Sequence, residues 1–122
     1  MQSYENIKVL KDVYLEDSFV TFIKADEVTL EFGIELVLRP EHEKFRAPAA
    51  NEAYCFRPAI LKFENASTIR WKRIRMMGTI DKNASIDFGN IDSFTFDAST
   101  FRLEGDWGEV EVSGGRVDLI FR

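Results

Sequence analysis

Large apolar residues alternate with polar ones over much of this chain, and the alternation is clearest between residues 28 and 38. The odd positions of that run carry Thr29, Glu31, Gly33, Glu35 and Val37. Because successive side chains of a strand point to opposite faces, the even positions share one face. The run therefore predicts a long strand whose buried face consists of Val28, Leu30, Phe32, Ile34, Leu36 and Leu38.

Shorter runs predict further strands. Residues 19–25 precede the long strand across a turn at Asp26 and Glu27. Residues 7–15 favour a strand, although their spacing also fits a helix, and Glu16, Asp17 and Ser18 form a turn signal after them. The remaining extended segments are 53–64, 68–77, 91–96, 100–105, 109–113 and 116–122.

The connections carry their own signals. Residues 39–52 hold two prolines and no periodicity, and we interpret them as a crossover loop between two sheets. Pro58 cannot donate a ladder hydrogen bond, so it predicts an edge position or a bulge. Gly114 and Gly115 offer the two positive-φ positions of a type I′ turn, and residues 105–108 predict a tight turn or a bulge.

These elements predict an all-β fold. About eight short strands without a strong helical pattern are typical of a single-domain antiparallel β-sandwich or partly open barrel with at most one short helix. The alternative is a β-rich chain with one helix. We expect residues 1–122 to form one domain, and eleven Phe residues suit a core between sheets.

Composition limits the partners and the compartment. The net charge of −5 argues against nucleic acid as a partner. The N-terminal residues show no signal peptide, and no apolar run approaches the roughly 20 residues of a membrane helix. Cys55 is the only cysteine, as expected of a small buried side chain in a reducing compartment. These features predict a cytoplasmic protein that does not bind membranes.

The most basic segment is residues 70–75, where four cations flank apolar residues. These cations are Arg70, Lys72, Arg73 and Arg75. Cations protect exposed sheet edges against aggregation, and they also attract an acidic protein partner. The segment therefore predicts an exposed sheet face or edge and a candidate partner-binding surface.

Trp107 extends that candidate surface because it lies between Asp106 and Gly108, at a predicted turn. An exposed indole would provide a stacking platform for a partner. The more common role of such a residue is to fold back as a plug of the core.

A cation-binding loop is a second hypothesis. Asp81, Asn83, Ser85 and Asp92 occupy positions one, three, five and twelve of a segment that echoes a calcium loop. Ile86 replaces the glycine expected at position six, and Asp92 is shorter than the usual Glu. A polar turn has the same composition, so we predict no bound cofactor.

Residues for catalysis are sparse. His42 lies between two acids in a loop, and Asp87, Asp92 and Glu104 are the carboxylates that could join it. An enzyme would require these side chains to converge in one cleft.

Four segments of the chain together carry a resemblance. They are residues 89–94 (GNIDSF), 101–110 (FRLEGDWGEV), 14–18 (YLEDS) and 54–57 (YCFR). In these segments the chain resembles a group of small bacterial proteins of unknown function. The resemblance implies a bacterial, cytoplasmic, all-β protein and supplies no catalytic residues.

We therefore predict a non-enzymatic interaction domain that recognises an acidic protein through a charged sheet face. Neutralisation of another bacterial protein, such as a toxin, would suit such a domain. A homodimer through an edge strand is a further expectation. The alternatives are a small-molecule-binding β-barrel with a Phe-lined cavity and, less favoured, an enzyme with a carboxylate and histidine site.

Overall fold

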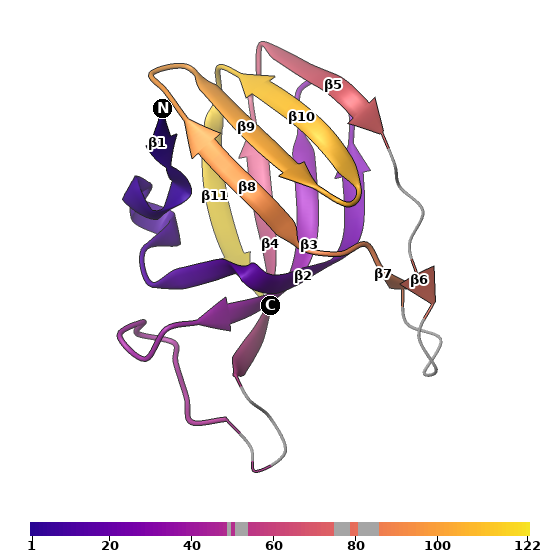
Figure 1. Ribbon diagram of the computed structural model, residues 1–122. Coiled ribbons are helices and arrows are strands. Elements are labelled where there is room, and N and C mark those ends of the chain that lie inside the picture. The colour runs from indigo at the N-terminus through magenta and orange to yellow at the C-terminus, as the bar shows by residue number, and fades with distance from the viewer. Residues whose placement is uncertain (49, 51–53, 75–78, 81–85) are drawn as a thin grey trace.

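The chain folds into two antiparallel sheets packed face to face (Figure 1). This computed structural model describes residues 1–48, 50, 54–74, 79–80 and 86–122. Sheet A has the order β1 (Gln2–Ser3), β8 (Ile91–Phe96), β9 (Thr100–Gly105), β10 (Gly108–Ser113) and β5 (Thr68–Ile74). Sheet B has the order β11 (Arg116–Phe121), β4 (Cys55–Glu64), β3 (Leu30–Leu38) and β2 (Val13–Ala25). The predicted all-β sandwich is confirmed, with open sheets rather than a closed barrel.

Four short elements complete the described chain. β6 (Thr79–Ile80) and β7 (Ile86–Asp87) form a small separate ladder. The N-terminal segment holds two 3₁₀ helices, η1 (Tyr4–Asn6) and η2 (Lys8–Leu10). Within the described residues, no helix has the length and apolar character needed to cross a membrane.

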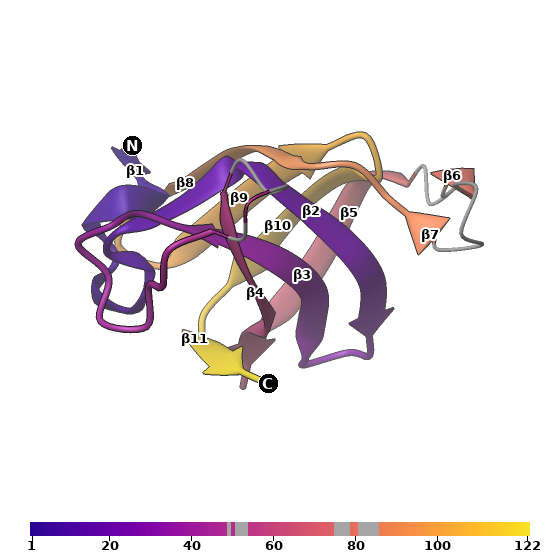
Figure 2. The same cartoon turned by 90° about the horizontal axis from the view of Figure 1, so that it is seen from below.

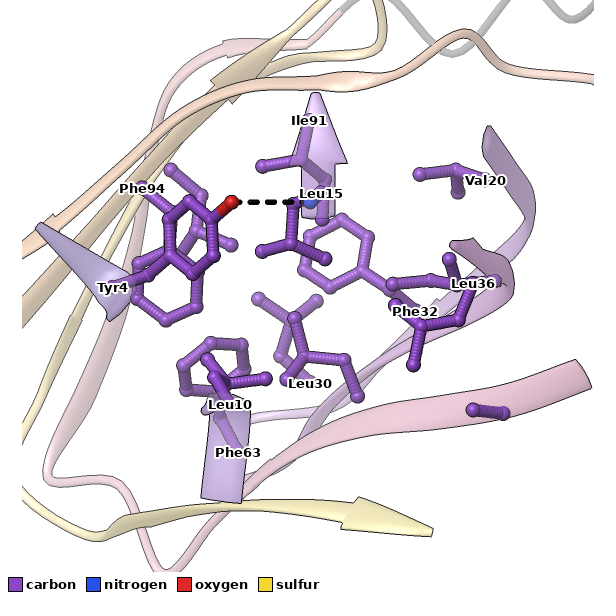
Figure 3. Packing of buried hydrophobic residues seen from close by; sticks show 14 of the residues in the cluster. Tyr4, Leu10, Leu15, Val20, Leu30, Phe32, Leu36, Phe63, Ile91 and Phe94 are labelled. Carbon is purple, nitrogen blue, oxygen red and sulfur yellow. Dashed lines mark hydrogen bonds between the residues drawn. The ribbon is translucent and has the colours of Figure 1, made fainter. Parts of the chain in front are cut away.

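The core lies between the sheets and follows the period of two. Leu30, Phe32, Ile34 and Leu36 of β3 are buried as predicted, whereas Val28 precedes the strand and is 48% exposed. Figure 3 shows Leu30, Phe32 and Leu36 packing together with Ile91 and Phe94 of sheet A and with Tyr4 and Leu10 of the N-terminal segment. Tyr4 joins this core with its ring, and its hydroxyl accepts the backbone N–H of Leu15 at 3.1 Å.

The strand predicted over residues 7–15 is wrong in its first half. η2 occupies Lys8–Leu10, and the Leu10 N–H donates to the Ile7 carbonyl at 2.9 Å. Ile7 and Leu10 are three residues apart, so this tight helical turn directs both toward the core, where Leu10 is fully buried. The strand begins only at Val13.

The turn predicted at residues 16–18 is also wrong, because β2 continues through it. Tyr14 pairs with Val37 and Phe19 pairs with Glu35, so the extra residues of β2 bulge out of the ladder. The buried Ser18 closes the bulge: its hydroxyl donates to the Tyr14 carbonyl at 2.7 Å and accepts the Val37 N–H at 2.8 Å. Figure 2 shows the resulting arc of β2.

The connections between sheets differ from expectation. The loop after Leu38 was predicted to cross between sheets, but β3 and β4 are neighbours in sheet B, where Leu38 pairs with Cys55. Gly114 and Gly115 have the predicted positive φ angles of 72° and 73°. They join β10 of sheet A to β11 of sheet B, so this short turn changes sheets. Loop length alone does not reveal whether two strands pair.

Pro58 lies in an interior strand rather than in an edge strand. β4 lies between β3 and β11, but the ladder with β11 ends where Phe121 pairs with Ala59. Pro58 comes just beyond that end, where its carbonyl accepts the Arg122 N–H at 3.0 Å. The missing proline N–H therefore falls at a local edge.

Candidate protein-interaction surface

The basic segment forms an edge of the sandwich. β5 is the last strand of sheet A and pairs only with β10 among the described residues. Arg70, Lys72 and Arg73 are exposed, whereas the neighbouring Ile69 and Trp71 pack against the core. The predicted exposed edge is therefore confirmed for Thr68–Ile74, and Arg75 lies outside the described residues.

A bulge shapes this edge. Glu109 pairs with Arg73 and Val110 pairs with Trp71, so Lys72 is the extra residue on β5. The bulge breaks the alternation, and both Lys72 and Arg73 are exposed with side-chain fractions of 40% and 41%. Bulges of this kind are common at sheet edges, where they re-aim side chains.

Acids on neighbouring strands accompany the cations. The Arg73 guanidinium lies 3.4 Å from the Glu104 carboxylate, and the Lys72 ammonium lies 3.4 Å from Glu111. Glu111 also accepts a hydrogen bond from Arg102 Nε at 2.7 Å. This bond, together with the one from Lys72, holds the pKa of the Glu111 carboxyl below its ordinary value. The outer face of sheet A is a ladder of opposite charges rather than a uniformly basic face.

Arg70 differs from the other two cations of the strand. It pairs across the ladder with Glu111, whose carboxylate is engaged by Lys72 and Arg102. No ion pair of Arg70 is found among the residues that the structure describes. Its charge is therefore the one on β5 that remains available to a partner.

The cations that crowd residues 57–75 in the sequence do not form one patch. Arg57 and Lys62 belong to β4 in sheet B, whereas Arg70 belongs to β5 in sheet A. Glu64, the single acid of the segment, contacts both Lys62 and Arg116. The fold thus divides the linear charge excess between two sheets.

Trp107 does not belong to the surface. Its side chain is fully buried, so its assignment as a partner-binding platform is wrong and its role as a core plug is confirmed. The ring lies 4.8 Å from that of Phe32 and 6.1 Å from that of Trp71, measured between centroids. Its Nε1–H donates to the Asn90 carbonyl at 3.2 Å. The tight β9–β10 turn therefore folds the indole back between the sheets.

The cation-loop hypothesis falls largely on residues that are not described. Asp81, Asn83 and Ser85 lie outside the described residues, and Asp92 is exposed at the start of β8. Partial burial, with the charges of Asp106 and Glu104, raises the pKa of the Asp92 carboxyl. Within the described part of the chain, no group of three or more His, Cys, Asp or Glu side chains is placed to hold a metal ion.

The residues considered for catalysis lie apart. His42 sits in the β3–β4 loop, 5.5 Å from the Phe121 ring, and its Nδ1 accepts the Lys44 N–H at 3.0 Å. Asp92 and Glu104 lie instead on β8 and β9 of sheet A. Figure 1 shows the described part of the loop after β3 and sheet A as separate regions. The described geometry does not bring His42 to these carboxylates.

Phe rings fill the space between the sheets instead of lining an interior barrel cavity. Phe63 contacts Phe32, Phe94 and Phe101 with centroid distances of 6.5, 5.7 and 5.3 Å. A groove of about 550 Å³ opens at one end of the sandwich, between the turn at residues 97–99 and Gly114.

Comparisons of the chain with protein-family models, with curated proteins and with solved structures find no match.

Sequence reasoning missed the acids that accompany β5. The alternation of Glu104 and Glu111 with apolar residues is typical of a solvated strand face, but nothing in the sequence predicts that β10 pairs with β5. The alternation of Glu109, Val110, Glu111 and Val112 was the available signal. Strand partners distant in sequence are not encoded in such local patterns.

Proposed function

We propose that this chain is a non-enzymatic protein-interaction domain that binds an acidic, extended segment of a partner along the free edge of β5. The supporting observation is the charge order across sheet A. On β10, Glu109 and Glu111 lie opposite Arg73 and Arg70 of β5. A strand added beyond β5 would continue this alternation if its outward side chains were acidic, because opposite charges in adjacent strands attract.

The other sheet edges are less open than β5. β1 has two residues. The edge of β2 is covered, because Val20 exchanges backbone hydrogen bonds of 2.8 and 3.0 Å with Gly89 and Phe88. On β11 the Asp118 carboxylate already accepts the Leu119 N–H at 2.8 Å. Among the described residues, no side chain accepts a hydrogen bond from a backbone N–H of β5 in this way.

Self-pairing of β5 is disfavoured. Two copies joined through this edge would set Arg70, Lys72 and Arg73 of one chain against the same cations of the other, and like charges in adjacent strands repel. The expected homodimer through an edge strand stays a prediction, and β5 is not its favoured edge. We place the interaction in a bacterial cytoplasm, a proposal that the lone buried thiol of Cys55 supports.

A defined peptide tests this proposal. A fluorescent peptide of about eight alternating Glu and Val residues should bind the folded protein, as measured by anisotropy. Arg70→Glu should weaken binding about tenfold, because it turns attraction into repulsion. Lys11→Glu is the matched control: Lys11 is exposed, and no ion pair of it is found among the described residues.

Backbone pairing is tested separately from charge. The same peptide carrying N-methyl groups on alternate residues keeps its carboxylates but loses backbone donors. We expect it to bind more weakly than the unmethylated peptide. Equal binding of both peptides would contradict strand addition, and equal binding by the wild-type protein and Arg70→Glu would contradict the surface assignment.

A further inference from the structure

Part of the outer face of sheet B is apolar, in contrast to the outer face of sheet A. The strand registers place Phe22, Gly33, Ile60 and Ile120 in one row across β2, β3, β4 and β11. The Phe22 ring lies over Gly33, at the place where a Cβ atom would otherwise stand. Ile120, at the edge of the row, is 42% exposed. The whole row therefore offers apolar surface outside the core.

The rows below continue this surface. Val37 pairs with both Tyr14 and Phe56, and Phe19 pairs with Glu35. The rings of Phe19 and Phe56 lie 5.8 Å apart between centroids. Val37 is only 3% exposed although it is not part of the cluster between the sheets. Its register partners Tyr14 and Phe56 flank it on the outer face of the sheet, so apolar residues continue across these strands.

The apolar surface has a clear border. The adjoining row consists of Lys24, Glu31, Lys62 and Asp118, which alternate in charge across the four strands. In such a row, opposite charges on adjacent strands attract each other, and the charged groups remain in contact with water. We call the surface beyond it the aromatic face and define it by Phe19, Phe22, Glu35, Phe56 and Ile60. These residues are half-buried in the folded chain. Contiguous apolar patches at a protein surface mark interaction sites.

Glu35 is the acid within the aromatic face. The register places it between Phe19 of β2 and Pro58 of β4. Partial burial raises the pKa of its carboxyl, and the nearby charge of Arg122 offsets part of this rise. The carboxylate is thus partly desolvated, and a cation brought to it from outside would meet a carboxylate that has already lost part of its hydration.

We propose that the aromatic face is a second docking surface, for a protein segment that presents one arginine or lysine between apolar side chains, with the cation at Glu35. The apolar flanks would cover the rings, and the cation would neutralise the carboxylate as water is excluded. This site goes beyond the proposed function, since it lies on the opposite sheet and selects the opposite charge.

The test is a selection of displayed random peptides of about twelve residues against the immobilised wild-type protein. Enriched peptides should carry one Arg or Lys flanked by aromatic or aliphatic residues. Each enriched peptide is then synthesised and its affinity is measured for wild type and variants. Glu35→Gln should weaken binding about tenfold, and Phe19→Ser should weaken it similarly.

Glu31→Gln is the matched control, because Glu31 lies on the same strand and outer face but in the row of alternating charges. It should leave the affinity unchanged. Because the carboxyl pKa of Glu35 is raised in the folded state, the ionised group lowers stability near neutral pH, and Glu35→Gln should unfold at a higher temperature than wild type. Lost binding therefore cannot be attributed to unfolding.

Three outcomes would overturn the proposal. In the first, no cationic peptide is enriched. In the second, Glu35→Gln does not change the affinities of the enriched peptides. In the third, the protein alone self-associates in sedimentation measurements, and Glu35→Gln abolishes this self-association. The last outcome would make a second copy of this chain the occupant. If the enriched peptides are acidic and Arg70→Glu weakens their binding, they bind at β5, and the aromatic face has no ligand of the proposed kind.

Discussion

At the scale of single residues, Trp107 connects the two sheets. Its indole packs on Phe32 of sheet B and on Trp71 of sheet A, and its ring nitrogen donates to Asn90. Gly105 makes this possible, because a Cβ atom there would collide with the indole and with the Asn90 carbonyl. A side chain that looked available for a partner is therefore a structural one.

Replacing Trp107 with Ala should lower the free energy of unfolding by about 3–5 kcal/mol, because it leaves a large cavity in the core. Trp107→Phe should cost less, about 1–3 kcal/mol, because it keeps much of the packing but leaves the Asn90 carbonyl without its donor. Urea denaturation followed by far-ultraviolet circular dichroism measures both values. If the urea denaturation curve of Trp107→Ala coincided with that of wild type, the structural role of the Trp107 side chain in the core would be contradicted.

Gly33 and Phe22 should behave as a coupled pair. Gly33→Ala alone should destabilise the protein by about 1–3 kcal/mol, because its new methyl group meets the Phe22 ring. In a Phe22→Ala background the same change should be nearly neutral, since the space is then open and Ala suits a strand better than Gly. A double-mutant cycle from urea denaturation measures the coupling, and additive effects would show that the ring does not cover Gly33.

At the scale of elements, local patterns predicted most strands but not their partners. The alternation of residues 30–38 is reproduced in β3, and the tight turns at 106–107 and 114–115 fall where glycines indicated them. The patterns failed where tertiary bonds override local signals. Ser18 shows this, because its turn-like neighbours form a bulge that depends on Val37, nineteen residues away.

The candidate site shows the same limit. Arg70, Lys72 and Arg73 were predicted to be exposed because their segment is basic, and they are. Acids of β10 lie beside these cations because β10 pairs with β5, a strand distant in the sequence. Composition does not encode this pairing. The aromatic face was missed for a related reason: Phe19 and Phe22 follow a bulge, which hides the face to which each ring points.

The bulge in β2 gives a prediction at this scale. Ser18→Ala should lower the free energy of unfolding by about 1–3 kcal/mol, because the buried Val37 N–H loses its acceptor. Thermal or urea denaturation checks this value. Thr21→Ala, a change at a half-buried residue of the same strand, serves as a comparison, and an equal loss in both variants would contradict a special role for Ser18.

The N-terminal segment gives a prediction about pH. Burial and the hydrogen bond to Glu16 raise the pKa of the Tyr4 hydroxyl above its ordinary value. The folded protein therefore keeps this proton where the unfolded chain, with a pKa of about 10, loses it. The resulting stability is present below pH about 10 and is lost as the pH rises further.

Tyr4→Phe removes this dependence. The variant should be less stable than wild type by about 1 kcal/mol at pH 8, because the Leu15 N–H loses its acceptor. The difference should shrink as the pH rises above about 10. Urea denaturation across the alkaline range measures it, and a constant difference would show that Tyr4 titrates normally.

At the scale of the whole molecule, the sandwich presents two outer surfaces of different character. Sheet A is covered by paired charges and ends in the open strand β5, whereas sheet B carries the aromatic face around Glu35. Because the acidic strand is proposed to bind at an edge of sheet A and the cationic segment at the outer face of sheet B, we expect that two partners or two segments of one partner can bind at once. The domain would then act as a bridge.

Strand addition at β5 is the central claim, and amide hydrogen exchange measured by NMR tests it most directly. With the alternating Glu and Val peptide bound, amides within Thr68–Ile74 should exchange more slowly, while those of β11, the edge of sheet B, should not change. Protection confined to β11, or no protection at a peptide concentration that saturates anisotropy, would contradict the account.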